Sequence, residues 1–410
     1  MINNIVIVSD FGYIEGGAAK IAINTAYELS RLCPDKRIVF FCGKGPFDLK
    51  LFQDNIDIVC TNQKELIDNR LTGFFQGIWN PLSRLRLQKL LNSLDKDKTI
   101  VHIHSWTKVL SSSVLSAVDR RLIVTLHDFF SICPNGAFYN YQTHNICTKS
   151  ALSLDCIADN CDKSHYAEKL WRVIRGKVHQ YFFKRINNFI VLSDLSYNIF
   201  NKSLLNKKFY KIKNPLIEYN SSINARVRVE DNKKFVFIGR LDSEKGVMLF
   251  VKALKATGFD AVFIGDGKLK TDIQKILPNS EITGWLDQKD VQKYLKDARC
   301  LVFPSVWYET FGLTVLEAGS LGIPSIVSAE CSAAELIDDI DPNSLFSSSD
   351  EEELIEKMNF IHGMDSIQLK DLSIRYFEKF NSNEFSVKNY VNGLLLAYEE
   401  IINGGPPSSQ

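Results

Sequence analysis

The sequence has no long hydrophobic run, no secretion signal and no cysteine framework. No apolar stretch approaches the ~20 residues that a transmembrane helix needs. The first residues, Met-Ile-Asn-Asn-Ile-Val-Ile-Val, resemble a β-strand and contain neither the basic region nor the cleavage site of a signal peptide. The nine cysteines are an odd number without disulfide-framework spacing, which suits a reducing compartment. We therefore expect a cytoplasmic protein in which any membrane contact is peripheral.

The sequence also lacks an excess of charge of either sign. Its 410 residues include 49 Lys and Arg against 48 Asp and Glu, a balance that does not indicate nucleic-acid binding. The charges are nevertheless unevenly distributed. Residues 1–215 contain 29 basic and 18 acidic residues, whereas residues 216–410 contain 20 and 30. A basic half joined to an acidic half indicates two surfaces with different partners.

Short β-branched and aromatic runs alternate with helical patterns along the chain. Each run is apolar throughout, which is typical of parallel strands covered on both faces. Strands are expected near 5–8, 37–41, 56–60, 100–104, 122–126 and 188–192, with helices near 18–32, 81–94, 107–118 and 165–187. After a polar stretch at 220–234, strands recur near 235–238, 261–264, 300–303 and 325–327. This α/β pattern predicts two Rossmann-like doubly wound domains, residues 1–213 and 214–385, with a disordered tail at 404–410.

The signature G-x-G-x-x-G of dinucleotide-binding dehydrogenases is absent. Gly16 and Gly17 instead follow the first expected strand, and Phe41-Cys42-Gly43, with no acidic residue, ends the second. A dehydrogenase is therefore disfavoured. The two glycines allow the backbone to approach an anion at the start of the following helix, although a plain strand-to-helix turn would look the same.

Charged residues follow two strands of the second domain. Arg240 and Lys245 flank the turn after strand 235–238 and form either a diphosphate clamp or a solvated basic turn. Glu309 and Glu317 follow strand 300–303, with Gly312 between them. The N–H groups after this glycine would face an anion, and Glu317 could accept from a ribose. A pair of surface glutamates at a helix start is the other interpretation.

Together and in this order, these motifs resemble the retaining GT-B glycosyltransferases of family 4, also called glycosyl transferases group 1. The family's E-x7-E signature is matched by Glu309 and Glu317, preceded by Phe-Pro-Ser and followed by Ala-Gly-Ser-Leu-Gly-Ile-Pro. The turn at 239–246 and the Gly16-Gly17 loop also match. The resemblance covers nearly the whole chain. It implies the GT-B fold, with two domains facing each other across a cleft and a last helix, about 386–403, packed back on the first domain.

The resemblance also implies a site, residue by residue. Arg240 and Lys245 would hold the donor diphosphate, Glu317 the ribose and Glu309 the sugar hydroxyls. His127, after strand 122–126, would approach the reacting carbon, although it is also explained as a structural strand-end histidine. The implied catalytic set is Glu309, His127, Lys245 and Arg240. The implied donor-binding set is Gly16, Gly17, Gly239, Arg240, Lys245, Gly265, Gly267, Gly284, Trp285, Glu309, Gly312, Leu313, Thr314 and Glu317.

The implied reaction transfers a hexose from a nucleotide diphosphate sugar, UDP- or GDP-linked, to a hydroxyl of a lipid-linked glycan in cell-surface polysaccharide biosynthesis. Anomeric configuration would be retained, and no cofactor would be required for catalysis, because protein cations would stabilise the leaving diphosphate. Two alternatives stay open. One is a sugar-nucleotide epimerase of the same fold, and the other is a non-catalytic glycan- or sugar-nucleotide-binding protein. The sequence departs from the family at 329–335, where Glu335 is present but the usual glycine pair is not.

Four cysteines fall within 29 residues of the first domain: Cys133, Cys147, Cys156 and Cys161. They could bind a structural zinc ion, with His144 and His165 as alternative ligands. The intervening 13, 8 and 4 residues include no Cys-x-x-Cys pair, so free thiols explain the pattern equally simply.

Two further segments of the first domain interleave basic and apolar residues at helical spacing. They lie at 64–98 and 169–185. Peripheral binding to an anionic membrane is one interpretation, and ordinary core-facing helices are the other.

Overall fold

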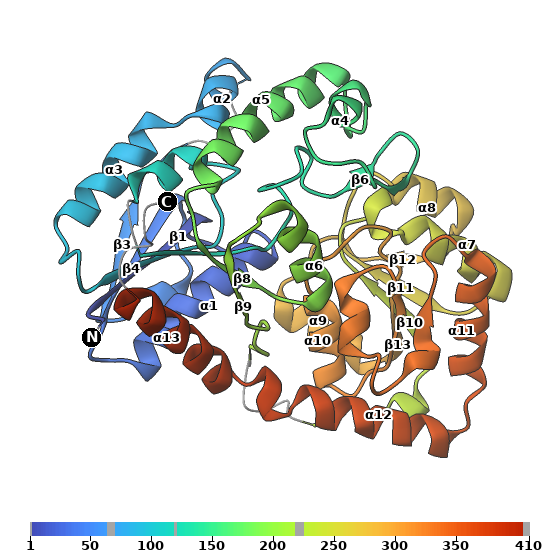
Figure 1. Cartoon of the computed structure of the whole chain (residues 1–410). Helices are drawn as coiled ribbons and strands as arrows, with labels where there is room; N and C mark the ends of the chain where they lie inside the picture. Colours follow the sequence, from blue (N-terminus) through green and yellow to red (C-terminus); the bar gives the residue numbers. More distant parts are fainter. Residues whose placement is uncertain (1, 64–69, 119–120, 218–224, 405–410) are drawn as a thin grey trace.

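Two parallel β-sheets, each flanked by helices, form the body of the protein (Figure 1). The computed structural model describes residues 2–63, 70–118, 121–217 and 225–404. The predicted linker at 220–234 and the predicted tail at 404–410 therefore lie partly outside the described residues, as does the first part of the basic segment at 64–98.

The first sheet contains seven strands in the order β3-β2-β1-β4-β5-β8-β9. Their bounds are β1 (Asn4–Phe11), β2 (Arg37–Lys44), β3 (Ile56–Cys60), β4 (Thr99–Ile103), β5 (Leu122–Thr125), β8 (Asn188–Val191) and β9 (Lys208–Lys211). Every neighbouring pair is parallel. The chain builds outward from β1 to β3 and then continues on the other side of β1 with β4. Ligands of open α/β sheets bind beside such a reversal, beyond the carboxyl ends of the strands.

The second sheet repeats this arrangement with six strands in the order β12-β11-β10-β13-β14-β15. Its reversal lies between β10 and β13. The bounds are β10 (Lys234–Ile238), β11 (Ala261–Ile264), β12 (Glu281–Ile282), β13 (Ala298–Phe303), β14 (Ser325–Ser328) and β15 (Leu345–Phe346). The predicted fold class, with two Rossmann-like parallel-sheet units, is confirmed.

In the first half of the protein, which contains the seven-stranded sheet, the helices expected near 18–32, 81–94 and 165–187 are present, and further helices occur as well. They are α1 (Gly17–Leu32), α2 (Arg70–Ile78), α3 (Pro81–Asn92), α4 (Leu154–Ala158), α5 (Tyr166–Phe183) and α6 (Asp194–Ser203). The expected helix at 107–118 is instead a short 3-10 turn, η2 (Ser112–Ala117), entered through Ser111 at a positive φ of 64°. Residues 133–165, before α5, contain the four clustered cysteines and are called the cysteine segment here. They include a two-stranded hairpin, β6 (Tyr139–Asn140) and β7 (Asn145–Ile146).

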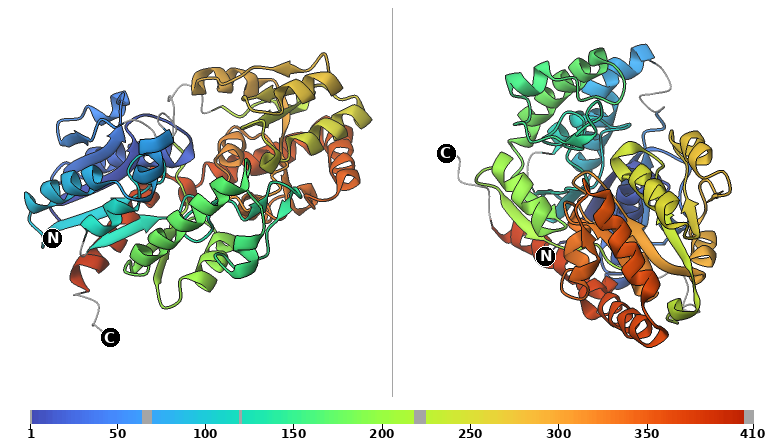
Figure 2. Two further views of the ribbon diagram at one scale, coloured as in Figure 1. Left: turned by 90° about the horizontal axis from the view of Figure 1, so that it is seen from above. Right: turned by 90° about the vertical axis from the view of Figure 1, so that its right-hand side faces the viewer.

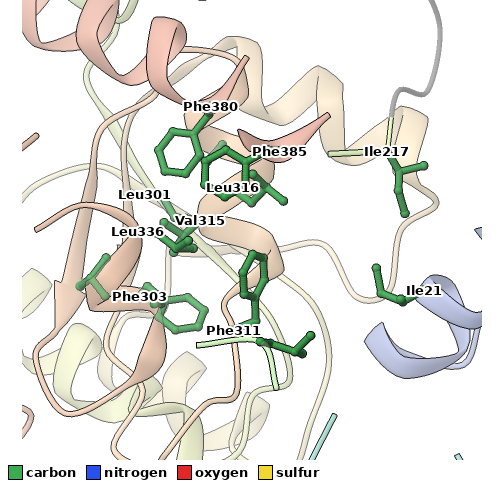
Figure 3. Close-up of a cluster of buried hydrophobic side chains, with 14 of the residues drawn as sticks. Ile21, Ile217, Leu301, Phe303, Phe311, Val315, Leu316, Leu336, Phe380 and Phe385 are labelled. Carbon is green, nitrogen blue, oxygen red and sulfur yellow. The ribbon is translucent and has the colours of Figure 1, made fainter. Parts of the chain in front are cut away.

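The second half contains α7 (Val247–Thr257), α8 (Lys270–Ile276), α9 (Gln288–Lys296), α10 (Leu313–Ser320), α11 (Glu351–Gly363) and α12 (Ser366–Phe380). The helices α10 and α12 pack closely because Gly319 leaves room for a ring. A Cβ at Gly319 would lie 2.1 Å from a ring carbon of Phe380. Figure 3 shows Phe380 and Phe385 beside Leu316 of α10. The same cluster of buried apolar side chains includes Ile21 of the first half, so one apolar core extends between the halves.

The last helix, α13 (Val387–Asn403), lies along the first half of the protein (Figures 1 and 2). Tyr390 bonds Thr25 of α1 through their hydroxyls at 2.8 Å. The hydroxyl of Tyr398 lies 2.6 Å from His102 Nδ1 on β4. After the second half, the chain thus returns to the first half through α13. Two buried tyrosines of α13 fix this helix against the first half.

Candidate active site

The Gly16-Gly17 loop faces the start of α10 across the boundary between the halves. Gly16 has a φ of 88°, which favours glycine, and α1 begins at Gly17. A Cβ at Gly17 would lie 3.1 Å from Leu313 Cδ1, the first residue of α10. On the other side, Gly312 has a φ of 110°, and its Cβ would lie 2.5 Å from Ala333 Cβ. Two glycines with little room for a side chain therefore bring two helix N-termini towards each other.

Lys245 and Glu309 form an ion pair at the end of the second sheet. Lys245 Nζ lies 2.5 Å from Glu309 Oε1. The same carboxylate oxygen accepts from Ser305 Oγ at 2.9 Å and from the Trp307 indole at 2.8 Å. Three donors thus fix Glu309, and the ammonium of Lys245 lies 5.1 Å from the centre of the Trp307 ring. The ammonium of Lys245 is suited to bind an anion, and the adjacent carboxylate of Glu309 is suited to accept hydrogen bonds from hydroxyl groups.

Arg240 shares two carboxylates with a cation from the first half. Its guanidinium lies 3.3 Å from Asp242 Oδ2 and 2.9 Å from Glu244 Oε1. Lys163, from the cysteine segment, lies 2.8 Å and 3.6 Å from the same two oxygens. Burial raises the pKa of Asp242, but Lys163 and Arg240 outweigh it and hold that pKa below its usual value. Lys163 and Arg240 together balance the two carboxylates, and the half-exposed guanidinium of Arg240 can still contact a further anion.

Glu317 pairs with a lysine that sequence reasoning did not identify. Lys20 of α1 forms an ion pair with Glu317 of α10, and its Nζ also donates to Gln288 Oε1 at 3.0 Å. The side chain of Lys20 is 11% exposed, so the pair is shielded from solvent and joins the two halves directly. The sequence could have indicated Lys20 by its position, one helical turn after the glycine loop. From that turn its side chain reaches Glu317 of the other half.

His127 is partly buried after β5 and lies beside the buried histidines His102 and His104 of the neighbouring strand β4 and its end. Its Nε2 lies 2.9 Å from His104 Nδ1, and the two rings stack at 5.2 Å. The carbonyl of His127 accepts from Thr310 Oγ1 at 2.8 Å, which is another contact between the halves. Burial lowers the pKa of His127 to about 3, so the imidazole is neutral at physiological pH.

A small polar cavity adjoins this histidine. It has a volume of about 10 Å³ and is lined by His104, Trp106, His127 and Asp128 among others. Within the described part of the chain, the His104 Nε2 and Trp106 Nε1 atoms are buried without a hydrogen-bond partner, and both residues line the cavity. Burial raises the pKa of Asp128 to about 6. The cavity is polar and large enough for one water molecule or one hydroxyl group.

Glycines meet at the ends of β10, β11 and β12. A Cβ at Gly265 would lie 2.0 Å from the carbonyl oxygen of Gly239, and one at Gly267 would lie 2.6 Å from that of Leu241. Gly265 also forms an isolated bridge with Gly284. The indole of the adjacent Trp285 is 67% exposed. These positions therefore present bare backbone beside an exposed aromatic ring.

Glu335 caps a helix of the other half. Its carboxylate accepts from the backbone N–H groups of Asp194 at 2.8 Å and Leu195 at 2.6 Å, at the start of α6. Nearby, Ser193 Oγ donates to Ser332 Oγ at 2.8 Å. The loop that departs from the family pattern therefore holds the halves together.

The zinc prediction is not supported. The described part of the chain contains no group of three or more His, Cys, Asp or Glu residues placed to hold a metal ion. The ammonium of Lys169 lies 2.8 Å from Cys161 Sγ and 3.7 Å from Cys156 Sγ. A metal cation there would be repelled by this buried positive charge. All nine cysteines are free of disulfide bonds.

Comparison with known proteins gives a family match for part of the chain. Residues 220–369 match the family Glycosyl transferases group 1. These residues carry Arg240, Lys245, Glu309 and Glu317.

Curated relatives match parts of the chain. An uncharacterized glycosyltransferase of Methanocaldococcus jannaschii is 30% identical over 187 residues, 40% of this chain and 45% of that protein. The alpha-D-kanosaminyltransferase of Streptomyces kanamyceticus is 25% identical over 130 residues, 29% of this chain and 33% of that protein. The chain therefore matches less than half the length of these relatives.

Solved structures match nearly all of the chain. Sucrose-phosphate synthase from Thermosynechococcus elongatus has a TM-score of 0.72 at 16% identity, covering 98% of this chain and all of that one. HepE of Anabaena in complex with UDP and glucose has a TM-score of 0.69 at 16% identity, covering 97% and 100%. The fold is GT-B, as predicted.

Three features were missed by sequence reasoning. They are the Lys20–Glu317 pair, the sharing of Asp242 and Glu244 by Lys163 and Arg240, and the cavity beside His104. The partners of the Lys20–Glu317 pair are 297 residues apart in the sequence. Short-range spacing carries no information about such contacts. The predicted residues His127 and Glu309, in contrast, both lie beyond strand ends, where the α/β rule places them.

Proposed function

We propose that this protein is a retaining glycosyltransferase that transfers a hexose from a nucleotide diphosphate sugar to a hydroxyl of a glycan acceptor. The observation that carries the proposal is the pair of ion pairs Lys245–Glu309 and Lys20–Glu317 at the boundary of two Rossmann-like units. Each pair sets a cation suited to a phosphate beside a carboxylate suited to a sugar. The family match over residues 220–369 supports the same reaction class.

The diphosphate would bind to Arg240, Lys245 and the N-terminus of α10. Among the residues that the structure describes, the buried side-chain oxygen of Thr314 in this first turn has no partner. The first N–H groups of a helix also have no intrahelical acceptor. Negative charge grows on the leaving phosphate as the glycosidic bond breaks. Preorganised cations and N–H groups stabilise that charge more than the ground state, which lowers the barrier.

The sugar end of the donor would lie between Glu309 and His127. Glu309 would accept from sugar hydroxyls, and the neutral imidazole of His127 would offer a hydrogen bond without repelling the oxocarbenium-like sugar. The acceptor hydroxyl would attack from the face that the phosphate leaves and pass its proton to that phosphate. Attack on this face retains the anomeric configuration.

The ribose of the donor would bind Glu317, and the base would lie over the bare backbone of Gly239, Gly265 and Gly284. In the absence of donor, Lys20 neutralises Glu317. Donor binding would therefore exchange a lysine for ribose hydroxyls at the same carboxylate.

The acceptor would be lipid-linked and reached at an anionic membrane surface. Among the described helices, none is long and apolar enough to cross a membrane. Apolar side chains of α2, α3 and α5 are exposed, notably Phe75 at 70%, Leu85 at 58%, Ile174 at 51% and Tyr181 at 58%. The helices α2 and α5 touch through the Trp171 indole, which donates to the Phe74 carbonyl at 3.0 Å. Exposed basic residues of α3 and α5 accompany this apolar surface, as in interfacial helices.

A thermal-shift screen of UDP-, GDP- and ADP-sugars tests the donor assignment. A true donor raises the melting temperature because it binds only the folded chain. Lys245→Ala and Glu309→Gln should each abolish most of the shift and the transfer activity. The control variants Lys252→Ala and Glu351→Gln, which alter an exposed ion pair between α7 and α11, should retain both the shift and the activity.

Equal transfer by Lys245→Ala and wild type would refute the site. Conversion of the sugar nucleotide without any acceptor would instead indicate an epimerase.

Sedimentation with vesicles tests the membrane assignment. Binding to phosphatidylglycerol vesicles should occur at low salt and weaken as salt is raised, because the attraction is screened. The double variant Phe75→Ser, Leu85→Ser should bind less. Leu49→Ser is the control, since Leu49 is 83% exposed on the same half but outside α2, α3 and α5. An absence of binding at low salt would refute the assignment.

A further inference from the structure

The buried lysine Lys169 has sulfur atoms as its neighbours. Its side chain on α5 is fully buried. Among the described residues its hydrogen-bond partners are Cys161 Sγ and Cys156 Sγ, and no carboxylate forms an ion pair with it. A buried ammonium without a counter-charge is strongly unfavourable. Cys161 and Cys156 are therefore the groups available to compensate the charge of Lys169.

The contact between Lys169 and Cys161 is unusually short. The nitrogen and sulfur atoms are 2.8 Å apart. Hydrogen bonds from nitrogen to oxygen are about 2.9 Å long, and sulfur is a larger atom than oxygen. Within the same cluster, Asn135 Nδ2 lies 3.5 Å from Cys161 Sγ and Lys169 Nζ lies 3.7 Å from Cys156 Sγ. The sulfur of Cys161 and the nitrogen of Lys169 are thus close enough for a single atom to join them.

Cys161 differs from the other thiols of the cluster in its electrostatic surroundings. Burial raises the pKa of the Cys133 thiol to about 11, so Cys133 remains protonated and donates to Asn135 Oδ1 at 3.1 Å. Burial also raises the pKa of Cys161, but the hydrogen bond and the charge of Lys169 oppose that rise. A thiol beside a cation is the one most readily converted to the nucleophilic thiolate. Cys161 is 4% exposed, and Ser164 and His165, three and four residues later in the chain, are exposed.

We propose that Cys161 and Lys169 form an oxidation site at which hydrogen peroxide creates a covalent N–O–S bridge between the two side chains. One thiol, one amine and two peroxide molecules give one bridge and three water molecules. The thiol loses its hydrogen and the amine loses one of its two. New S–O and O–N bonds form around one oxygen atom that peroxide supplies. Sulfur and nitrogen are oxidised by four electrons in total, and the two peroxide molecules are reduced.

The bridge would fasten the cysteine segment to α5. Cys161 is two residues before Lys163, which contacts Asp242 and Glu244 of the other half. The bridge would hold Lys163 at the carboxylates that it shares with Arg240. The bridge does not depend on the proposed transferase activity, so the two proposals fail separately.

Mass spectrometry of the wild-type protein tests the bridge directly. The protein is reduced, treated with hydrogen peroxide, cleared of excess peroxide with catalase and digested with trypsin without reductant. Trypsin cleaves after Lys149, Lys163 and Arg172, so the bridge joins peptide 150–163 to peptide 164–172 with no cleavage after Lys169. The joined pair should be heavier by one oxygen and lighter by two hydrogens than the sum of the two peptides. Treatment with dithiothreitol should separate it.

Variants assign the bridge to its residues. Cys161→Ser and Lys169→Arg should abolish the joined pair, whereas Cys156→Ser and the distant control Cys33→Ser should retain it. If Lys169→Arg fails to fold, the wild-type and Cys156→Ser digests still decide the question. A disulfide between Cys156 and Cys161, a joined pair without the extra oxygen, or unmodified peptides after peroxide treatment would each overturn the proposal.

Discussion

At the scale of single residues, the candidate site is a set of charges that neutralise one another. Lys245 pairs with Glu309, Lys20 with Glu317, and Arg240 with Asp242 and Glu244. A donor would therefore compete with existing partners for each charged side chain that it binds. The sequence predicts Arg240, Lys245 and both glutamates because their positions follow strand ends and match the motifs of the family that the chain resembles. It does not predict their partners, because Lys20 and Lys163 come from distant segments.

Removal of the ammonium of Lys245 should weaken the binding of nucleoside diphosphate. A charge-assisted hydrogen bond contributes about 1.5–3 kcal/mol, which corresponds to roughly 10–100-fold in affinity. Isothermal titration calorimetry of Lys245→Ala should show a loss of that size, while Lys252→Ala should bind as wild type. A loss below about threefold would argue against a phosphate contact.

The buried histidines should make the protein less stable in acid. Burial lowers the pKa values of His102, His127 and His179 to about 3, below the usual value of 6.5. Between these two pH values the unfolded chain binds protons that the folded chain does not, so the free energy of unfolding falls as pH falls. Each histidine contributes about 1.4 kcal/mol per pH unit in this window.

Urea unfolding between pH 7 and pH 4 measures this dependence. His179 lies outside the proposed site, so His179→Gln should lessen the pH dependence by about one proton without changing the other two histidines. An unchanged dependence would show that His179 is protonated in the folded protein.

At the scale of secondary-structure elements, glycines determine how closely the helices approach. The positions of the longer, buried strands follow from apolar runs, whereas the short strands β9, β12 and β15 were not predicted. The helix expected at 107–118 is instead a 3-10 turn, because Ser111 takes a positive φ and its hydroxyl accepts from Ser113 N. The zinc prediction fails for a different reason. The spacing of cysteines cannot reveal that a lysine from the next helix occupies the space between them.

The packing of α10 on α12 should be sensitive to one methyl group. Gly319→Ala would place a Cβ 2.1 Å from the ring of Phe380, and overpacking of this kind costs about 1–3 kcal/mol. Gly363→Ala is the matched control, because no atom of the described chain beyond its own helical turn and chain neighbours lies within 4 Å of its Cβ position at the end of α11. It should leave the stability unchanged or raise it by up to about 1 kcal/mol. Chemical denaturation of both variants measures the difference, and equal effects would contradict the packing.

At the scale of the whole molecule, contacts between the halves hold the two sheets in one arrangement. They include Lys20–Glu317, Glu335 at the start of α6, and the hydroxyls of Ser193 and Ser332. The two-sheet architecture could be predicted because each half repeats one α/β pattern. The relative position of the halves could not, because it depends on apolar packing and polar contacts between residues far apart in sequence. The sequence has a basic first half and an acidic second half. At the boundary, the basic residues Lys20 and Lys163 of the first half form ion pairs with acidic residues of the second half.

Reversal of one charge at this boundary should separate the halves. Lys20→Glu would place two carboxylates together and should increase the radius of gyration measured by small-angle X-ray scattering. The double variant Lys20→Glu, Glu317→Lys restores the opposite charges and should return the radius towards that of wild type. An unchanged radius for Lys20→Glu would show that this pair does not hold the halves together.

The central claim is that the boundary between the two Rossmann-like units binds the diphosphate of a sugar nucleotide. Calorimetric titration of UDP, GDP and ADP into the wild type and into Arg240→Ala is the most direct test. We predict that at least one of these nucleotides binds the wild type and that Arg240→Ala weakens it by about tenfold or more, as expected for a lost charge-assisted contact. No binding of any nucleotide, or equal binding by both proteins, would contradict the claim.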